Sequence, residues 1–209
     1  MKRSHSIAIK RAVDLLLAIP LSVLAVPIVL ISGLAIFIAD PGPIIIVQSR
    51  EGLHGKTFRM WKLRTMYRQA ADILARHIAS DASARVEWET YQCFRHDPRV
   101  LPFIGKLLRR TSIDELPQLW NVLKGEMSLV GPRPFPLDLI GSLDITLRGQ
   151  RATVLPGMTG LWQVSGRGDI ALDQLQKYDL FYVNHWTPRL DLWILSKTIP
   201  AVIRGKGAY

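Results

Sequence analysis

The chain has 209 residues, enough for one domain with a hydrophobic core and an appended segment, but too few for two complete catalytic domains. Its 27 Lys and Arg outnumber its 17 Asp and Glu. The resulting net charge of +10 predicts an acidic partner, such as nucleic acid, anionic lipid or a phosphate-rich substrate. Cys93 is the only cysteine, which excludes an internal disulfide.

The N-terminal segment predicts a membrane anchor. No charged residue occurs from Leu15 to Ala39, whereas a helix needs only about 20 apolar residues to cross a bilayer. This run is too long for the apolar region of an ordinary signal peptide, and Phe37 and Ala39 do not form a small-x-small cleavage pattern. We therefore expect residues 1–40 to form an anchor that the mature protein keeps.

Two topologies are open for this anchor. A single crossing is the default for such a run, but cations flank both of its ends, and cationic flanks favour the cytoplasmic side. Pro20 and Pro27 lie inside the run, and Pro27, near its middle, would kink a helix. A re-entrant helix that bends at Pro27 and returns to the same face accounts for both observations. Asp14 fits this topology if Arg11, three residues earlier on the same helical face, offsets its charge. The flanking cations are Lys2, Arg3, Lys10, Arg11, Arg50, Lys56, Arg59, Lys62, Arg64 and Arg68.

Residues 41–209 predict a separate, mainly helical α+β domain. The β-branched run 44–47 and the loosely alternating run 57–63 are joined by a glycine-containing turn at 51–55, which favours a β-hairpin. Residues 67–93 contain no Pro or Gly and favour one or two surface helices.

Later segments are also expected to be helical. Pro98 and Pro102 separate the helical region before them from the segment 104–110. Near the C-terminus, one apolar stripe at helical spacing suits either an interfacial membrane helix or an ordinary core helix. Its residues are Trp186, Leu190, Trp193 and Ile194.

Two adjacent acids in the middle of the chain, Asp114 and Glu115, have two compatible interpretations. The sequence from Ser112 to Glu115 matches a capping box, in which both polar side chains satisfy the first N–H groups of a helix. Pro117 disfavours a regular first turn, so we expect this helix to start late or to be distorted. The other interpretation is a phosphate-handling site, because the N-terminal end of a helix attracts phosphate and keeps a carboxylate ionised.

Basic residues around the acids favour a site. Arg133 lies between two prolines that fix their own backbone, and its planar guanidinium can grip phosphoryl oxygens. Lys62 in the predicted hairpin and Arg109 before the acids add positive charge. A carboxylate pair with surplus cations suits a pyrophosphate and a divalent metal. A solvated basic face is the alternative for any one of these cations alone.

Four long motifs, in order, resemble the bacterial sugar transferases, the small monotopic members of the polyprenyl-phosphate phosphoglycosyl transferase superfamily. The resemblance covers nearly the whole chain. The motifs are Lys10-Arg-Ala-Val-Asp14 with Pro27, Phe58-Arg-Met-Trp-Lys-Leu-Arg-Thr-Met66, the block from Asp114 to Pro134, and Pro156-Gly-Met-Thr-Gly-Leu-Trp-Gln-Val-Ser-Gly-Arg167.

The resemblance implies transfer of a sugar 1-phosphate from a UDP-sugar to undecaprenyl phosphate, with release of UMP, as the first membrane step of exopolysaccharide synthesis. By this resemblance, Asp114 is the nucleophile that forms a phosphosugar-aspartyl intermediate, and Glu115, with Asp114, holds Mg²⁺. The implied location is the cytoplasmic face of the bacterial inner membrane, without nucleic acid as a partner. Basic positions that bind phosphate are Lys62, Arg109 and Arg133, and weaker substrate contacts are Gln163 and Arg167.

Two positions depart from the family pattern. Val26 stands where many members have Ser before the bending proline, so the bend depends on Pro27 alone. Leu155 stands where a basic residue often precedes the Pro-Gly of the later loop. The resemblance to exopolysaccharide enzymes favours UDP-galactose or UDP-glucose, and a UDP-N-acetylhexosamine is the alternative. Other classes that fit part of the sequence are a membrane-tethered scaffold, a nucleic-acid binder and a metal-dependent pyrophosphatase.

Overall fold

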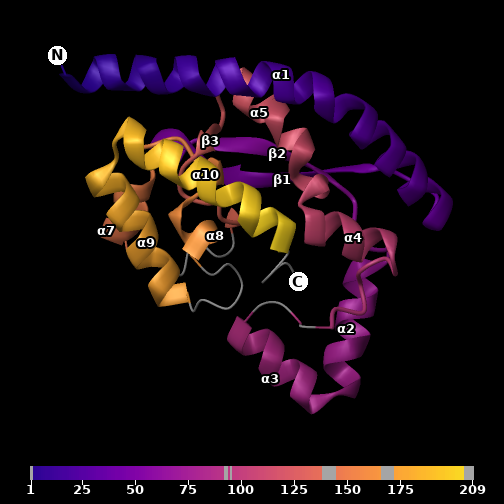
Figure 1. The fold of residues 1–209 in the computed structure, drawn as a ribbon. Helices are drawn as coiled ribbons and strands as arrows, with labels where there is room; N and C mark the ends of the chain where they lie inside the picture. The colour runs from indigo at the N-terminus through magenta and orange to yellow at the C-terminus, as the bar shows by residue number, and fades with distance from the viewer. Residues whose placement is uncertain (1, 92–93, 95, 138–144, 166–171, 205–209) are drawn as a thin grey trace.

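The fold is mainly helical, with two small two-stranded sheets, as a computed structural model shows (Figure 1). The structure describes residues 2–91, 94, 96–137, 145–165 and 172–204. In chain order, the elements are α1 (Lys2–Ala39), β1 (Ile45–Glu51), η1 (Leu53–Gly55), β2 (Thr57–Leu63), α2 (Ala70–Ser80), α3 (Ala82–Tyr91), α4 (Ile104–Thr111), η2 (Ile113–Gln118), α5 (Leu119–Lys124), β3 (Ser128–Val130), α7 (Ile145–Arg151), β4 (Gly157–Thr159), α8 (Leu161–Ser165), α9 (Leu172–His185) and α10 (Pro188–Arg204).

The predicted hairpin is confirmed. Strands β1 and β2 are antiparallel, and Ile45 pairs with Leu63 at one end while Glu51 pairs with Thr57 at the other. The first strand runs further than the β-branched segment suggested, because its polar half also finds partners in β2. The turn is the short 3₁₀ helix η1, in which His54 takes a left-handed conformation with φ of 56°. The second sheet is a short parallel pair of β3 and β4.

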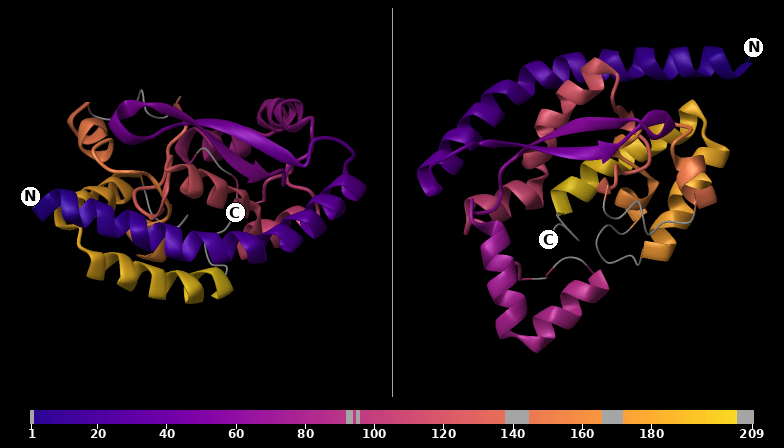
Figure 2. Two further views of the ribbon diagram at one scale, coloured as in Figure 1. Left: turned by 90° about the horizontal axis from the view of Figure 1, so that it is seen from above. Right: turned by 180° about the vertical axis from the view of Figure 1, so that it is seen from behind.

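The N-terminal helix α1 is one continuous helix of 38 residues that passes through both prolines. It extends along one side of the domain and curves around it, as the two further views show (Figure 2). The helix therefore does not fold back on itself within the described residues. It contacts α4, η2, α5 and β3. The element that was expected to be an anchor is thus also one wall of the domain.

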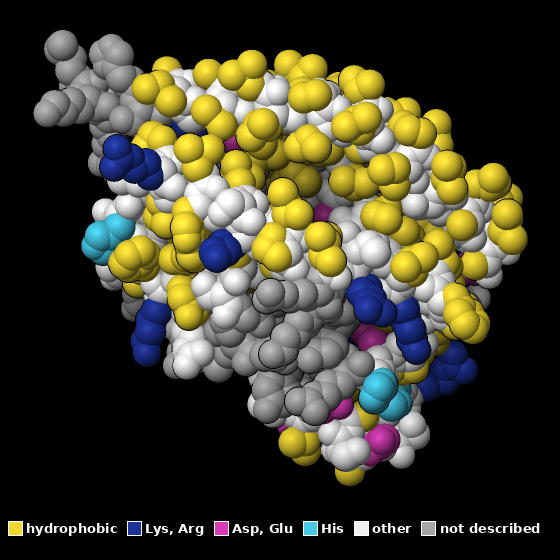
Figure 3. Space-filling view, in the orientation of Figure 1, with side chains coloured by type: hydrophobic (Ala, Val, Ile, Leu, Met, Phe, Trp, Pro, Cys, Tyr) yellow, Lys and Arg dark blue, Asp and Glu magenta, His cyan; other side chains and the backbone are white. Residues whose placement is uncertain are grey.

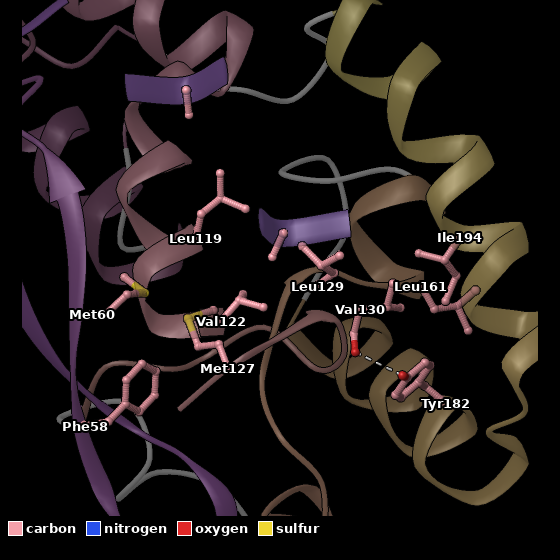
Figure 4. Close-up of a cluster of buried hydrophobic side chains, with 12 residues drawn as sticks. Phe58, Met60, Leu119, Val122, Met127, Leu129, Val130, Leu161, Tyr182 and Ile194 are labelled. Carbon is pink, nitrogen blue, oxygen red and sulfur yellow. Dashed lines mark hydrogen bonds between the residues drawn. The ribbon is translucent and has the colours of Figure 1, made fainter. Parts of the chain in front are cut away.

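The main core includes side chains from α1. Ala18 and Ala25 from α1 share a buried cluster with residues from β2, α5, β3, α8, α9 and α10. Figure 4 shows much of this cluster, in which the Tyr182 hydroxyl donates to the carbonyl oxygen of Val130 at 3.1 Å. Burying apolar side chains from so many elements is the main stabilising contribution to the fold.

Polar contacts fix the N-terminal half of α1 on the domain. Lys10 Nζ lies 2.6 Å from the carboxylate of Asp191 in α10. Arg11 donates to the carbonyl oxygens of Val122 and Leu123 at 2.6 and 2.9 Å, near the C-terminal end of α5. That end carries a partial negative charge, which a cation stabilises.

Asp14 has other partners than expected. Its carboxylate accepts hydrogen bonds from the Ser128 hydroxyl and the Leu129 N–H, both at 3.0 Å. The expected pairing of Arg11 with Asp14 is therefore wrong. Spacing along a helix places two side chains on one face. In the packed domain, however, Arg11 binds carbonyl groups of α5 and Asp14 binds donors of β3.

The outer surface of α1 is apolar. Among the described residues, one helix, Ile7–Ala39, has the length and mean hydropathy of a membrane-crossing helix, and 22% of its most apolar window is buried in the fold. Hydrophobic side chains cover this helix and continue over the same face of the molecule (Figure 3). Exposed apolar residues elsewhere in the chain include Phe103, Leu107, Trp120, Leu192, Trp193, Ile199 and Ile203. Such a surface is typical of contact with a membrane.

The C-terminal stripe divides between the two expected environments. Ile194 is fully buried in the main core, and Leu190 and Trp186 pack against that core. Trp193 is 46% exposed. Helix α10 is thus a core helix on one side and has an exposed apolar side as well.

Candidate active site

The two central acids lie on η2, a short 3₁₀ helix between α4 and α5. Ser112 takes a left-handed conformation with φ of 56° at this junction, and its side chain forms no capping hydrogen bond. The expected capping box is therefore not formed. The distortion expected from Pro117 is confirmed, since regular α-helix begins at Leu119. A 3₁₀ turn directs Asp114 inward, where it is 2% exposed.

Three segments bring charged side chains together at Asp114. Lys62, on β2, places its Nζ 2.8 Å from Asp114 Oδ2 and 3.7 Å from Glu115 Oε1. Arg133, on the loop after β3, places its Nη2 3.3 Å from the same Glu115 oxygen. The sequence predicted all four residues for one site, and the structure brings them into contact.

Burial dominates the electrostatics of Asp114. Loss of water raises the pKa of its carboxyl group above the ordinary value, and the negative charge of Glu115 acts in the same direction. The Lys62 ammonium opposes this rise by stabilising the carboxylate. Asp114 is therefore a carboxylate that water stabilises poorly and that one lysine stabilises directly.

Arg109 approaches the same acid from α4. Its Nε donates to the Thr65 hydroxyl at 3.0 Å. Burial lowers the pKa of the Arg109 guanidinium, while the charges of Asp114 and Asp97 raise it. Arginine nevertheless stays charged in proteins, so Arg109 adds a fixed positive charge near Asp114, as the sequence predicted. Thr65 was not predicted to be a site residue. The one signal in the sequence is its position two residues after the end of β2, close to Lys62.

Backbone hydrogen bonds hold the loop that carries Arg133 against the segment of β4. Gly131 N donates to the Thr159 carbonyl, and Gly157 N donates to the Pro132 carbonyl, both at 2.9 Å. The two segments are so close that a Cβ on Gly157 would lie 2.0 Å from Gly131 N. Glycine is required here for close approach.

The side chain of Arg133 remains accessible. It is 38% exposed, and its guanidinium lies 5.7 Å from the ring centroid of Trp162. At this distance the ring face attracts the cation. Trp162 was not predicted as a site residue, although it lies in the motif next to Gln163.

Gln163, Arg167 and Pro27 are the other residues that the sequence predicted to have a role. Gln163 is 7% exposed, and its Nε2 donates to the Met158 carbonyl at 2.8 Å, so in this conformation it supports its own loop. Arg167 lies outside the described residues. Pro27 lies within continuous helix on the exposed side of α1.

A third residue that sequence reasoning missed is Asn121. It is fully buried, donates to the Arg59 carbonyl and accepts from the Trp61 N–H, at 2.7 and 3.2 Å. These groups lie directly before Lys62 along β2, so Asn121 fixes the backbone that leads into this lysine. In the sequence, Asn121 differs from its neighbours in being an amide among apolar residues, and this is the one feature that could have pointed to a structural role.

The acids fit a magnesium ion that is shared with a substrate. Among the described residues, no group of three or more His, Cys, Asp or Glu could hold a metal ion alone. Mg²⁺ commonly takes one or two carboxylates and completes its shell with water and substrate phosphate. Glu115, 19% exposed beside the buried Asp114, offers such a partial set of oxygen ligands.

Comparison with known proteins gives one family. The family described as "Bacterial sugar transferase" matches residues 5–205. The chain is 42% identical to the undecaprenyl-phosphate galactose phosphotransferase of Salmonella typhimurium, over 96% of this chain and 42% of that protein. It is 40% identical to the exopolysaccharide production protein ExoY of Sinorhizobium fredii, over 96% and 88%. It is 39% identical to the UDP-glucose:undecaprenyl-phosphate glucose-1-phosphate transferase of Caulobacter vibrioides, over 96% and 72%. The chain thus spans less than half the length of the first of these relatives.

Proposed function

Because this chain belongs to the bacterial sugar transferase family, we propose that it transfers a sugar 1-phosphate from a UDP-sugar to undecaprenyl phosphate and releases UMP. The observation that supports this reaction most directly is the buried Asp114 carboxylate 2.8 Å from Lys62, beside Glu115 and Arg133. The names of relatives also support it, since they describe undecaprenyl-phosphate sugar transfer and exopolysaccharide production.

Asp114 acts as the nucleophile in this proposal. Its oxygen forms a bond to the sugar-proximal phosphorus while the bond from that phosphorus to the UMP oxygen breaks. A phosphate oxygen of undecaprenyl phosphate then bonds to the same phosphorus, and the Asp114 carboxylate leaves. Burial supports both steps, because a carboxylate with a raised pKa is more basic and poorly hydrated.

The cations bind and orient phosphoryl oxygens. Lys62 already lies near both acids, so a phosphate approaching Asp114 also approaches its ammonium. Arg133 can direct its accessible fork of donors at two oxygens of one phosphoryl group. Arg109, on α4, adds a further positive charge near Asp114. Positive groups fixed where negative charge develops lower the barrier of such a transfer.

Mg²⁺ is the proposed cofactor, and Glu115, with Asp114, would hold it. When bound, the ion neutralises pyrophosphate charge and makes UMP a better leaving group. Glu115 shares its Oε1 between Lys62 and Arg133, so it also keeps both cations at the site.

We propose the cytoplasmic leaflet of the bacterial inner membrane as the location, with α1 as a re-entrant anchor that curves along its length and does not fold back on itself. The apolar outer face of α1 and the cations near both of its ends support this topology. Single cysteines at positions 5 and 50, in a Cys93→Ser background, should both resist a membrane-impermeant thiol reagent added outside intact cells. Labelling of one position alone would establish a full crossing instead.

Galactose or glucose is the proposed sugar, because relatives are named for these sugars. The alternative is a UDP-N-acetylhexosamine. Initial rates with each UDP-sugar at equal concentration decide between them.

The test of the reaction uses the whole chain in detergent, with Mg²⁺, UDP-sugars and undecaprenyl phosphate, and follows UMP. We expect turnover that requires the lipid, and a loss of at least about a thousandfold in Asp114→Asn. The matched control is Asp72→Asn, an acid exposed on α2, which should leave the rate unchanged. Undiminished turnover in Asp114→Asn would exclude this residue as the nucleophile.

Two other classes make different predictions in the same assay. A pyrophosphatase releases UMP and free sugar phosphate without the lipid. A membrane-tethered scaffold releases no UMP from any UDP-sugar. Oligonucleotides should not compete with the substrate, since the positive charge is expected to serve lipid and nucleotide phosphates.

A further inference from the structure

Arg151, the last residue of α7, is a cation that the proposed reaction does not use. Its side chain is 9% exposed, although a charged side chain is rarely buried without partners. The guanidinium makes three contacts, one to α9 and two to the loop that carries Arg133. Its Nη1 atom, its Nη2 atom and its flat face each make one of these contacts.

The first contact is with α9. Arg151 Nη1 lies 2.8 Å from Asp179 Oδ2, and the Asp179 side chain is only 3% exposed. Removing two charges from water is expensive, so a buried ion pair of this kind contributes little net stability. It does fix where the guanidinium lies, because neither charge has access to water as an alternative partner.

The other contacts reach the loop of Arg133. Arg151 Nη2 donates to the main-chain carbonyl oxygen of Arg133 at 2.7 Å. The guanidinium also lies over the ring of Phe135, 3.8 Å from its centroid. The loop is therefore held on this side by Arg151 and on the other by the backbone bonds of Gly131 and Pro132.

Arg133 needs this support because its own side chain is weakly held. Its closest ionic contact is 3.3 Å long and its side chain is 38% exposed. The position of its main chain thus decides where its guanidinium can reach.

We propose that Arg151, oriented by Asp179, is a positioning residue that fixes the main chain of Arg133 for phosphate binding. This inference rests on the proposed function for the role of Arg133, but the bracing itself is a property of the fold. Arg151→Lys keeps the charge and can still reach Asp179, yet a single ammonium cannot replace a planar fork that bonds a carbonyl and stacks on a ring.

The kinetic test is a double-mutant cycle. We expect Arg151→Lys to lower kcat/KM for the UDP-sugar about 10- to 100-fold, as a misplaced binding group does. In an Arg133→Ala background the same change should lower kcat/KM less than about twofold, because the group that Arg151 positions is absent. Arg148→Lys on the same helix, whose arginine pairs with Glu51 on the surface, is the matched control. Additive losses would overturn the proposal.

Hydrogen exchange tests the bracing without any activity. Arg133 and Phe135 supply amide protons between prolines, and Arg151→Lys should speed their exchange about tenfold while α1 and the hairpin stay unchanged. Unchanged exchange in Arg151→Lys would overturn the inference. Faster exchange in that variant, together with a wild-type protein that transfers no sugar, would refute the proposed function alone. If Arg151→Lys is globally unstable, Asp179→Asn serves in both assays, and it should give the same pattern.

Discussion

Replacing Asn121 by Ala tests how the hairpin strand is held at the site. Within the described part of the chain, strand β2 has one partner strand, β1, so its other edge needs hydrogen bonds from elsewhere. Asn121 supplies two, to the Arg59 carbonyl and from the Trp61 N–H. The Ala variant leaves these two part-buried backbone groups without this partner, at about 1–3 kcal/mol each.

The expected loss of stability is therefore about 4 kcal/mol. For a chain of this size, this lowers Tm by roughly 8 to 16 °C, which differential scanning fluorimetry in detergent measures. Asn121→Asp should be no better, because a carboxylate cannot donate to the Arg59 carbonyl and lies beside Glu126, 2.7 Å from the present amide nitrogen. Asn184→Ala, at an exposed position of α9, is the control. A drop of less than 2 °C in both Asn121 variants would refute the reasoning.

Two further changes test packing and charge. Gly157→Ala should lower the free energy of unfolding by at least about 3 kcal/mol, because its Cβ would meet backbone, whereas Gly149→Ala has open space and should leave Tm unchanged or higher. Burial raises the pKa of Asp179 from 3.8 to about 6, against the charges of Arg151 and Arg133. The native state then holds a proton that the unfolded state releases, so stability falls as pH rises from about 4 to about 6, by at most about 3 kcal/mol. Asp179→Asn should flatten this slope in denaturant titrations between pH 4 and 7, and an unaltered slope would contradict the assignment.

Local signals predicted the local structure well. The hairpin, the helices before Pro98 and the distortion at Pro117 each depend on neighbouring residues, which a sequence displays directly. The meeting of Lys62, Asp114, Glu115 and Arg133 was also predicted, because phosphate chemistry needs such charges and the motifs are long.

Tertiary partners were harder to predict. Nothing in the sequence indicates that Arg151 and Asp179, 28 residues apart, share a buried pair. The carbonyl groups that Arg11 binds belong to the end of a helix more than 100 residues later. Spacing alone suggested Asp14 as its partner, and the available carbonyl groups of α5 outweighed that suggestion.

The hydrogen bonds from Arg11 to α5 connect the proposed membrane anchor to the proposed site. Asp114 lies on η2, which continues directly into the helix whose end Arg11 holds. With α1 as the proposed membrane anchor, the distance from Asp114 to the bilayer is set by α1 itself and not by the connection that follows Asp40. Extra residues inserted at Pro41 should leave that distance unchanged, whereas a turn added to α1 between Arg11 and Pro27 would shift the whole site relative to the lipid phosphate.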